Sequence, residues 1–180
     1  MFRRRLSRVI RRMGRQHVLP MLQHANQLLS GGSYAEATRA FEQLAHGAED
    51  RFSERAPFLF LQAGRAAILD GQTQTGVAHL RRGLTLLGSQ GRFARMQMLG
   101  QGIADELSAH GFSQEAAEIA ALLSASPPGR SEPEPAAVAK KPVLPTHCLA
   151  CGGSVRADEV EWLDEVTAEC AYCGSPVRGE

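Results

Sequence analysis

The sequence predicts a mainly α-helical protein, built as a stack of helical hairpins with a small C-terminal β unit. The first observation is helical periodicity broken by glycines up to about residue 125, with no alternating strand pattern of useful length. The second is a repeat, because the small residues Ala25, Gly64 and Ala104 stand 39 and then 40 residues apart in similar contexts. The third is that all four cysteines follow residue 147, in two close pairs.

Composition and charge limit the class of protein. The 180 residues are 43% hydrophobic and 22% charged, which is typical of a globular chain. Apolar runs are far shorter than the roughly 20 residues that cross a bilayer, and the N-terminus lacks the features of a secretory signal. We therefore expect a cytoplasmic protein. The net charge of +1 conceals opposite ends, since residues 1–35 carry seven Arg and no acid, whereas residues 146–180 carry two Arg and seven acids.

Residues 1–16 predict a basic amphipathic helix. One helical face is apolar and carries Phe2, Leu6, Val9, Ile10 and Met13. Arginines fill the rest and are the candidates for contact with an anionic surface: Arg3, Arg4, Arg5, Arg8, Arg11, Arg12 and Arg15. Such a helix can lie on an anionic membrane, bind nucleic acid, dock on an acidic protein, or pack on the next helices with its arginines in solvent. We expect peripheral binding to the inner face of the membrane.

Residues 17–125 predict three helical hairpins. The small residue on each first helix is followed seven positions later by a glycine, and twelve positions later by another small residue. The glycines are Gly32, Gly71 and Gly111, the second small residues are Ala37, Gly76 and Ala116, and four positions further stand Phe41, Leu80 and Ala120. Small residues let two helices approach closely. Glycine accepts the left-handed conformation that ends a helix, so each glycine marks the turn of one hairpin.

This pattern resembles the tetratricopeptide repeat over residues 18–128. Tyr34-Ala35-Glu36-Ala37-x3-Phe41 is the closest match, and Pro128 falls where the third repeat's terminal proline would. The repeats lack the family's Trp and exceed its usual period of about 34 residues. A plain six-helix solenoid or bundle is the alternative.

The resemblance implies a solenoid whose concave face binds a peptide or helix. It places Asn26, Arg65 and Asp105 on that face as candidates for contact with a partner. One amide, one cation and one acid do not form a basic clamp for a peptide C-terminus, and the alternative is that all three are ordinary solvated helix positions.

Residues 126–146 predict a flexible linker. Six prolines stand there, at 127, 128, 133, 135, 142 and 145, among small and charged residues. Such a segment cannot support a packed element and is extended by about 3 Å per residue where it is polyproline-like. We expect the flanking modules to tumble separately and the linker to be cut first by proteases.

Residues 147–180 predict a metal site. The four cysteines Cys148, Cys151, Cys170 and Cys173 have the spacing C-x2-C-x18-C-x2-C, which is typical of a Cys₄ zinc site. Each C-x2-C turn places two thiolates on one edge of a tetrahedron, and the glycine after each pair permits the tight turn beneath them.

The segment resembles a zinc ribbon over residues 146–180, and the alternating pattern of residues 154–169, between the cysteine pairs, predicts a short β-hairpin and return strand. The resemblance implies one structural Zn²⁺ ion per chain. Four thiolate ligands leave no position for a reactive water, so the site is not hydrolytic. A rubredoxin-like iron site and a dithiol redox pair are the alternatives, and His147 is expected to be a bystander.

The function that these features predict is a non-catalytic one. The sequence has no phosphate-binding loop, no nucleophile with a base and no open metal site, so we do not expect an enzyme. The acidic C-terminal unit repels phosphates. Trp162 and Tyr172 are the aromatics expected to anchor a protein partner, and the alternative for Trp162 is that it covers the zinc knuckles as core. We expect a protein-interaction adaptor with a peptide-binding helical repeat and a structural zinc ribbon. The alternative is a nucleic-acid-associated accessory factor of transcription or translation that uses the arginine-rich N-terminus and the ribbon.

Overall fold

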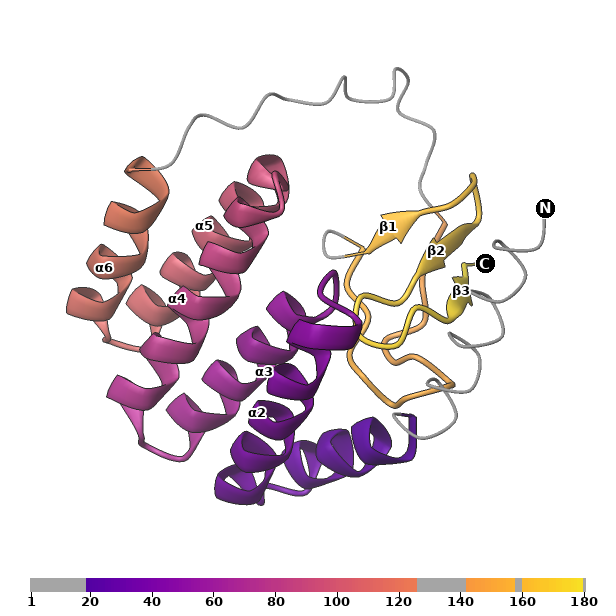
Figure 1. Cartoon of the computed structure of the whole chain (residues 1–180), viewed down its shortest axis with the longest axis horizontal. Coiled ribbons are helices and arrows are strands. Elements are labelled where there is room, and N and C mark those ends of the chain that lie inside the picture. Colours follow the sequence, from indigo (N-terminus) through magenta and orange to yellow (C-terminus); the bar gives the residue numbers. More distant parts are fainter. Residues whose placement is uncertain (1–18, 126–141, 158–159, 180) are drawn as a thin grey trace.

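A computed structural model describes residues 19–125, 142–157 and 160–179 (Figure 1). The arginine-rich segment 1–16, with all its surface-binding candidates, and most of the proline-rich segment 126–146 lie outside the described residues. What the sequence predicts for these two segments therefore stays a prediction.

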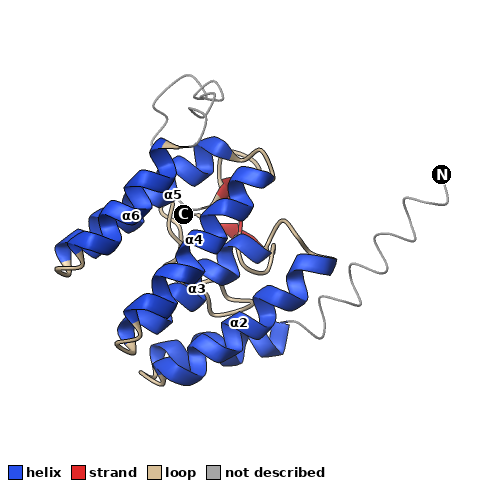
Figure 2. Ribbon diagram, turned by 60° about the vertical axis from the view of Figure 1, so that its left-hand side comes forward, coloured by secondary structure: helices blue, strands red, loops and turns tan. Residues whose placement is uncertain are grey.

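The described part contains six helices and a small antiparallel sheet. A helix over residues 19–30 is followed by α2 (Tyr34–Arg51), α3 (Ala56–Leu69), α4 (Thr73–Ser89), α5 (Phe93–Ala109) and α6 (Ser113–Ser124). Neighbouring helices pack on one another in chain order, so they form a stack (Figure 2). The three predicted hairpins are present, each as two consecutive helices joined by a short turn.

Glycines end the first helix of each hairpin as predicted. Gly32, Gly71 and Gly111 have φ angles of 80°, 78° and 85°, which are in the left-handed region that side chains disfavour. Small residues also hold α3 and α4 together as predicted. A Cβ added to Gly64 would lie 2.8 Å from the carbonyl oxygen of Gly76, so the two backbones are in direct contact at this point.

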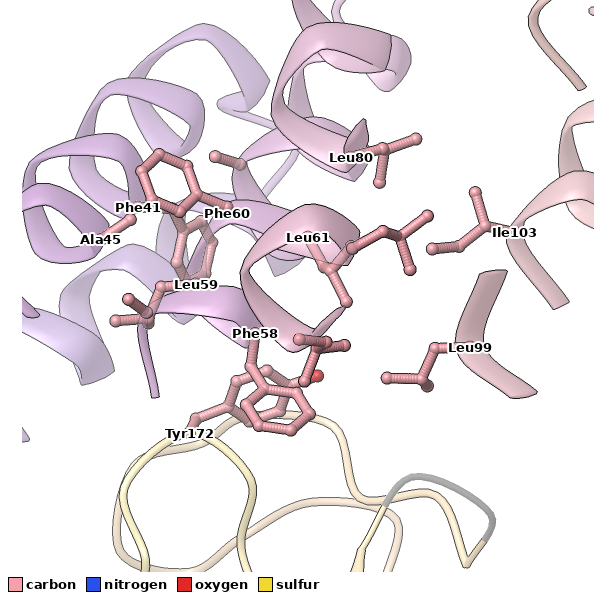
Figure 3. Close-up of a cluster of buried hydrophobic side chains, with 14 of the residues drawn as sticks. Phe41, Ala45, Phe58, Leu59, Phe60, Leu61, Leu80, Leu99, Ile103 and Tyr172 are labelled. Atoms are coloured by element: carbon pink, nitrogen blue, oxygen red, sulfur yellow. The ribbon is translucent and has the colours of Figure 1, made fainter. Parts of the chain in front are cut away.

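Helix α3 lies at the centre of the core. Its residues from Ala56 to Gly64 are all buried, on every side of the helix. A helix that is apolar all round has to be covered on all faces. Figure 3 shows Phe60 facing Phe41 of α2, while Leu61 points toward α5 and Phe58 points toward the C-terminal unit.

The C-terminal unit (described residues 142–157 and 160–179) contains three short strands. They are β1 (Glu161–Trp162), β2 (Thr167–Glu169) and β3 (Pro176–Arg178), paired antiparallel in the order β1-β2-β3. Ala168 pairs with Trp162 on one side and Val177 on the other. The pair β1–β2 lies in the segment between the cysteine pairs where a hairpin is predicted, whereas β3 follows the second cysteine pair and is not predicted; the sheet buries Ala168 and Val177.

The C-terminal unit packs against the helices, and one continuous apolar core runs through both. This arrangement differs from the expectation that two modules tumble separately. A proline-rich tether sets how far its ends can separate, but it does not prevent the units it joins from docking. Several of the contacts that dock them are formed by side chains whose partners lie more than 100 residues away.

Candidate metal centre and docking interface

The four cysteines form a compact cluster of sulfur atoms. Their Sγ atoms all lie within 4.8 Å of one another, and all four side chains are buried. Cys148 lies 3.7 Å from Cys173, and Cys151 lies 3.8 Å from Cys170, measured between Sγ atoms. A tetrahedral ion with bonds of about 2.3 Å to sulfur requires sulfur atoms about 3.8 Å apart. The cluster therefore has the dimensions for one four-coordinate metal ion, and no disulfide is formed.

Each cysteine pair sits on a turn of the same construction, which we call a knuckle. The amide of the first cysteine donates to the carbonyl five residues later, and the glycine after the second cysteine donates to the first cysteine's carbonyl. In knuckle 1 the amide of Cys148 donates to the carbonyl of Gly153, and the amide of Gly152 donates to the carbonyl of Cys148, both at 2.8 Å. In knuckle 2 the amide of Cys170 donates to the carbonyl of Ser175 at 2.9 Å, and the amide of Gly174 donates to the carbonyl of Cys170 at 2.8 Å. Gly152 and Gly174 have φ angles of 75° and 67°. The glycine after each pair is thus required by the turn, as the sequence predicts.

The thiols perturb one another because they are close and buried. The hydrogen bond with Cys170 raises the pKa of Cys151 most, and burial adds to this. The pKa of Cys173 is held well below its usual range by hydrogen bonds from Cys151 and then Cys170. For Cys170 the bond with Cys151 lowers the pKa, but the bond with Cys173 and burial outweigh it and raise the pKa to about 12.

Without a cation, these contacts favour the thiolate form of Cys173 and the protonated forms of Cys151 and Cys170. A divalent ion would displace those protons and bind four thiolates. A tetrahedral set of four sulfurs suits Zn²⁺ or iron. His147 does not belong to the cluster, since its ring is exposed and its Nδ1 lies 3.0 Å from the Thr146 hydroxyl.

Side chains of the helical stack cover knuckle 1. The amide of Asn26 donates to the carbonyl of Cys151 at 3.0 Å, and the amide of Gln23 donates to the carbonyl of Ala150 at 2.7 Å. The Asn26 Cβ also lies near Gly152, the glycine of this turn. The helix over residues 19–30 therefore recognises the backbone of knuckle 1.

A single arginine covers knuckle 2. Arg55 donates from Nη1 to the carbonyl of Tyr172 at 3.5 Å and from Nη2 to Oε1 of Glu169 at 3.2 Å. A Cβ added to Gly174 would collide with the guanidinium of Arg55, so the arginine lies directly on this glycine. Its side chain is 17% exposed, whereas that of Glu169 is 38% exposed, so the ion pair is only partly shielded from water.

Tyr172 inserts into the helical stack. It stands between the two cysteines of knuckle 2, is 5% exposed, and accepts a hydrogen bond on its hydroxyl from the buried amide of Gln62. Figure 3 shows its ring reaching from the C-terminal unit toward α3, where Phe58 lies, with Leu99 of α5 nearby. The expectation that Tyr172 anchors a partner protein is therefore wrong, because its ring is buried against its own chain. Trp162 is partly buried and packs against the same core.

Two further arginines extend the interface beside Phe58. Arg92 and Arg95 place their guanidinium groups 5.1 and 5.5 Å from the centre of the Phe58 ring. Arg95 also donates to the carbonyl of Val160 in the C-terminal unit at 3.1 Å. Together with Arg55 these residues line a cavity of about 480 Å³ between the helices and knuckle 2.

The three residues predicted for the partner face have different partners in the structure. Asn26 bonds to knuckle 1, as described above. Arg65 lies 3.8 Å from Glu106, and Asp105 is exposed and accepts a hydrogen bond from Gln101 at 2.9 Å. Among the three, only Arg65 lines the larger cavity described next.

A second cavity, of about 680 Å³, lies between the helices and the C-terminal unit. We call it the groove. Its walls are mostly apolar side chains of α3 and α5, among them Leu69 and Ile103, and Ser154 and Arg156 of the C-terminal unit also line it. The sequence gives no sign that Arg156 contributes to this wall, since it lies far along the chain from the other residues.

Comparisons with protein-family models, curated proteins and solved structures find no match to this chain. None of the described helices has the length and apolar character that a transmembrane segment requires.

Proposed function

We propose that this protein is a non-catalytic adaptor. Its helices act as a tetratricopeptide-like solenoid that binds a protein partner, and its C-terminal unit is a zinc ribbon with one structural Zn²⁺ ion. The groove carries this proposal, because a cavity of about 680 Å³ with mainly apolar walls is the kind of surface on which an amphipathic helix of a partner buries its apolar face.

The accessibility of the groove supports the proposal further. Leu69, which lines it, is 56% exposed. The cysteine cluster supports a structural role for the ion, because four buried thiolates fill a tetrahedron and leave no position for a substrate. Within the described residues these cysteines are also the only group with the geometry of a metal site.

A matched pair of variants tests the partner-binding role. Leu69→Arg places a charge in the groove, whereas Met98→Arg places the same charge on a residue that is 43% exposed and does not line the groove. Both side chains are largely exposed, so both variants are expected to fold. In crosslinked pull-downs from cells, a partner should be captured by the wild type and by Met98→Arg and lost by Leu69→Arg. Equal capture by the two variants contradicts the groove as the binding surface.

We further propose that the protein is cytoplasmic and that residues 1–16 bind it peripherally to anionic membranes. The support is the sequence pattern of arginines around one apolar face. Flotation with anionic vesicles should fall when Arg4, Arg8 and Arg11 become Gln, and it should weaken as salt is added. If a chain that starts at Gln16 floats as well as the full chain, the membrane proposal is wrong and an acidic protein is the better candidate.

A further inference from the structure

We propose that the helical stack is part of the metal site. Asn26 and Arg55 hold the two knuckles against the helices, so that metal binding and docking of the C-terminal unit stabilise each other. Loss of the ion then uncovers apolar surface on α3 and α5. This coupling goes beyond the adaptor role, and it holds whether or not the groove binds a partner.

The first step is the small size of the C-terminal unit. Its strands are two or three residues long, and its own buried apolar side chains are few: Val155, Val160, Ala168 and Val177 besides Tyr172 and the cysteines. A unit of this size cannot bury enough surface to fold without further stabilisation. Two sources are present in the chain, namely the metal ligands and the helical stack.

The second step is that the helices recognise backbone atoms of the knuckles. Asn26 donates a hydrogen bond to the carbonyl of Cys151, and Arg55 donates one to the carbonyl of Tyr172, two residues after Cys170. These carbonyls have fixed directions only while the knuckles are closed. An ion that draws the four Sγ atoms together therefore also fixes the acceptors that the helices bind.

The third step is the position of Tyr172 between two metal ligands. Because Cys170 and Cys173 flank it, an ion bound to both fixes the segment from which the ring projects. The ring and hydroxyl are buried on α3 through Phe58 and Gln62. Without an ion this segment is free to rearrange, and Phe58 and Leu99 lose the cover that Tyr172 gives them.

These steps make the metal and the helices thermodynamically linked. Whatever stabilises the docked knuckles raises metal affinity, and the metal stabilises the docked state by the same free energy. Residues that orient metal ligands from outside typically change metal affinity about 10- to 100-fold when they are removed. Asn26 and Arg55 are positioning residues of this kind, since neither contacts the cluster of sulfur atoms directly.

Zinc affinity of the full chain is the first test. Competition with a chromogenic chelator should show about 10-fold weaker Zn²⁺ binding or more in Asn26→Ala and in Arg55→Ala. Arg55→Lys should recover only part of the loss, because an ammonium group cannot reproduce the planar fork that reaches both Tyr172 and Glu169. The matched control is Arg81→Ala, which removes an exposed arginine that pairs with Glu118 away from the interface, and it should bind Zn²⁺ like the wild type.

The second test measures the reverse effect, of the metal on the helices. Removing Zn²⁺ with a chelator should lower the midpoint of helix melting, followed by circular dichroism at 222 nm, and should increase binding of an apolar dye. In Arg55→Ala the same chelation should shift the midpoint less. Trp162, the single tryptophan of the chain, reports separately on the C-terminal unit.

Either of two results would overturn the proposal. One is a Zn²⁺ affinity that is unchanged in both Asn26→Ala and Arg55→Ala, and the other is a helix-melting midpoint that does not respond to chelation. If Arg55→Ala does not fold, Asn26→Ala decides, because it removes one half-buried amide and little packing. A failure here leaves the groove variants of the adaptor proposal unaffected, since Leu69 and Met98 lie outside the residues that dock the knuckles.

Discussion

The repeat pattern and the structure predict opposite effects of Gly64→Ala on the stability of the protein. The equivalent positions of the other two hairpins hold alanine, namely Ala25 and Ala104, so the pattern alone suggests that alanine is tolerated at position 64. Alanine in a helix interior is favoured over glycine by about 1 kcal/mol. From the pattern, Gly64→Ala should therefore be neutral or stabilising.

The structure gives the opposite sign. A Cβ at position 64 would lie 2.7 Å from Cγ of Leu80 and 2.8 Å from the carbonyl oxygen of Gly76. The leucine can change rotamer, but the carbonyl belongs to the backbone of α4, and carbon–oxygen contacts are normally no shorter than about 3.3 Å. Helices α3 and α4 would have to separate by about 0.5 Å in the most buried part of the core. Such overpacking costs about 1–3 kcal/mol, which exceeds the propensity gain.

The cost less the propensity gain leaves a net loss, so we expect Gly64→Ala to lower the free energy of unfolding by up to about 2 kcal/mol, or Tm by a few degrees for a chain of this size. Gly102→Ala is the matched control, since Gly102 also lies inside a helix but a Cβ there meets no atom within 4 Å. It should gain up to about 1 kcal/mol from helix propensity alone. Urea denaturation of both variants with Zn²⁺ present measures the two signs. If Gly64→Ala is as stable as the wild type, the close approach of α3 and α4 is not as described.

Three further predictions concern the metal, an ion pair and the linker. Elemental analysis should find one Zn²⁺ ion per chain. Cys170→Ser should lose the ion and unfold the C-terminal unit, while far-ultraviolet circular dichroism still shows the helices. Absence of metal in the wild type would contradict this. Burial raises the pKa of Glu49, but hydrogen bonds from Arg82 and His46 outweigh burial and lower it. The contribution of the Glu49 carboxylate to folding stability is therefore present above the unfolded pKa of about 4.3 and is lost as the pH falls through the folded pKa. The stability difference between the wild type and Arg82→Ala, below about 1 kcal/mol at pH 7, should thus shrink as the pH falls below the unfolded pKa and the Glu49 carboxylate is protonated in the folded state. Cleavage within residues 126–146 should leave two fragments that co-elute in gel filtration when Zn²⁺ is present and elute separately after chelation. Fragments that separate although Zn²⁺ is present would show that docking is weak.

Local patterns were sufficient to predict the helices and the cysteine cluster. Helix turns depend on single glycines such as Gly32 and Gly71, whose left-handed φ angles are a local property of the backbone. The cluster follows from ligand types at fixed spacings, because each knuckle closes within six residues. These features need no knowledge of which distant segments meet, so one sequence is enough to predict them.

Docking of the C-terminal unit could not be predicted in the same way. Gln23 and its partner Ala150 are 127 positions apart, and the atom that accepts the bond is a backbone carbonyl, which every residue has. Arg55 and Asn26 are polar residues on helices and look like solvated positions. One signal was present, however, since α3 is apolar on every side around Phe58 and needs a cover on the face that the other helices leave open.

The docked arrangement changes what an adaptor built on this chain would look like. Tyr172 occupies the part of α3 and α5 beside Phe58 and Leu99, so that surface is not available to a partner protein, whereas the groove is. Arg156 belongs to one wall of that groove, and its segment directly follows the knuckle formed by Cys148 and Cys151. Under the adaptor proposal, the C-terminal unit is then not a second, separate contact module. The C-terminal unit instead forms part of the partner-binding surface of the helical stack. A chain truncated after residue 125 would lose both one wall of the groove and the cover of Phe58.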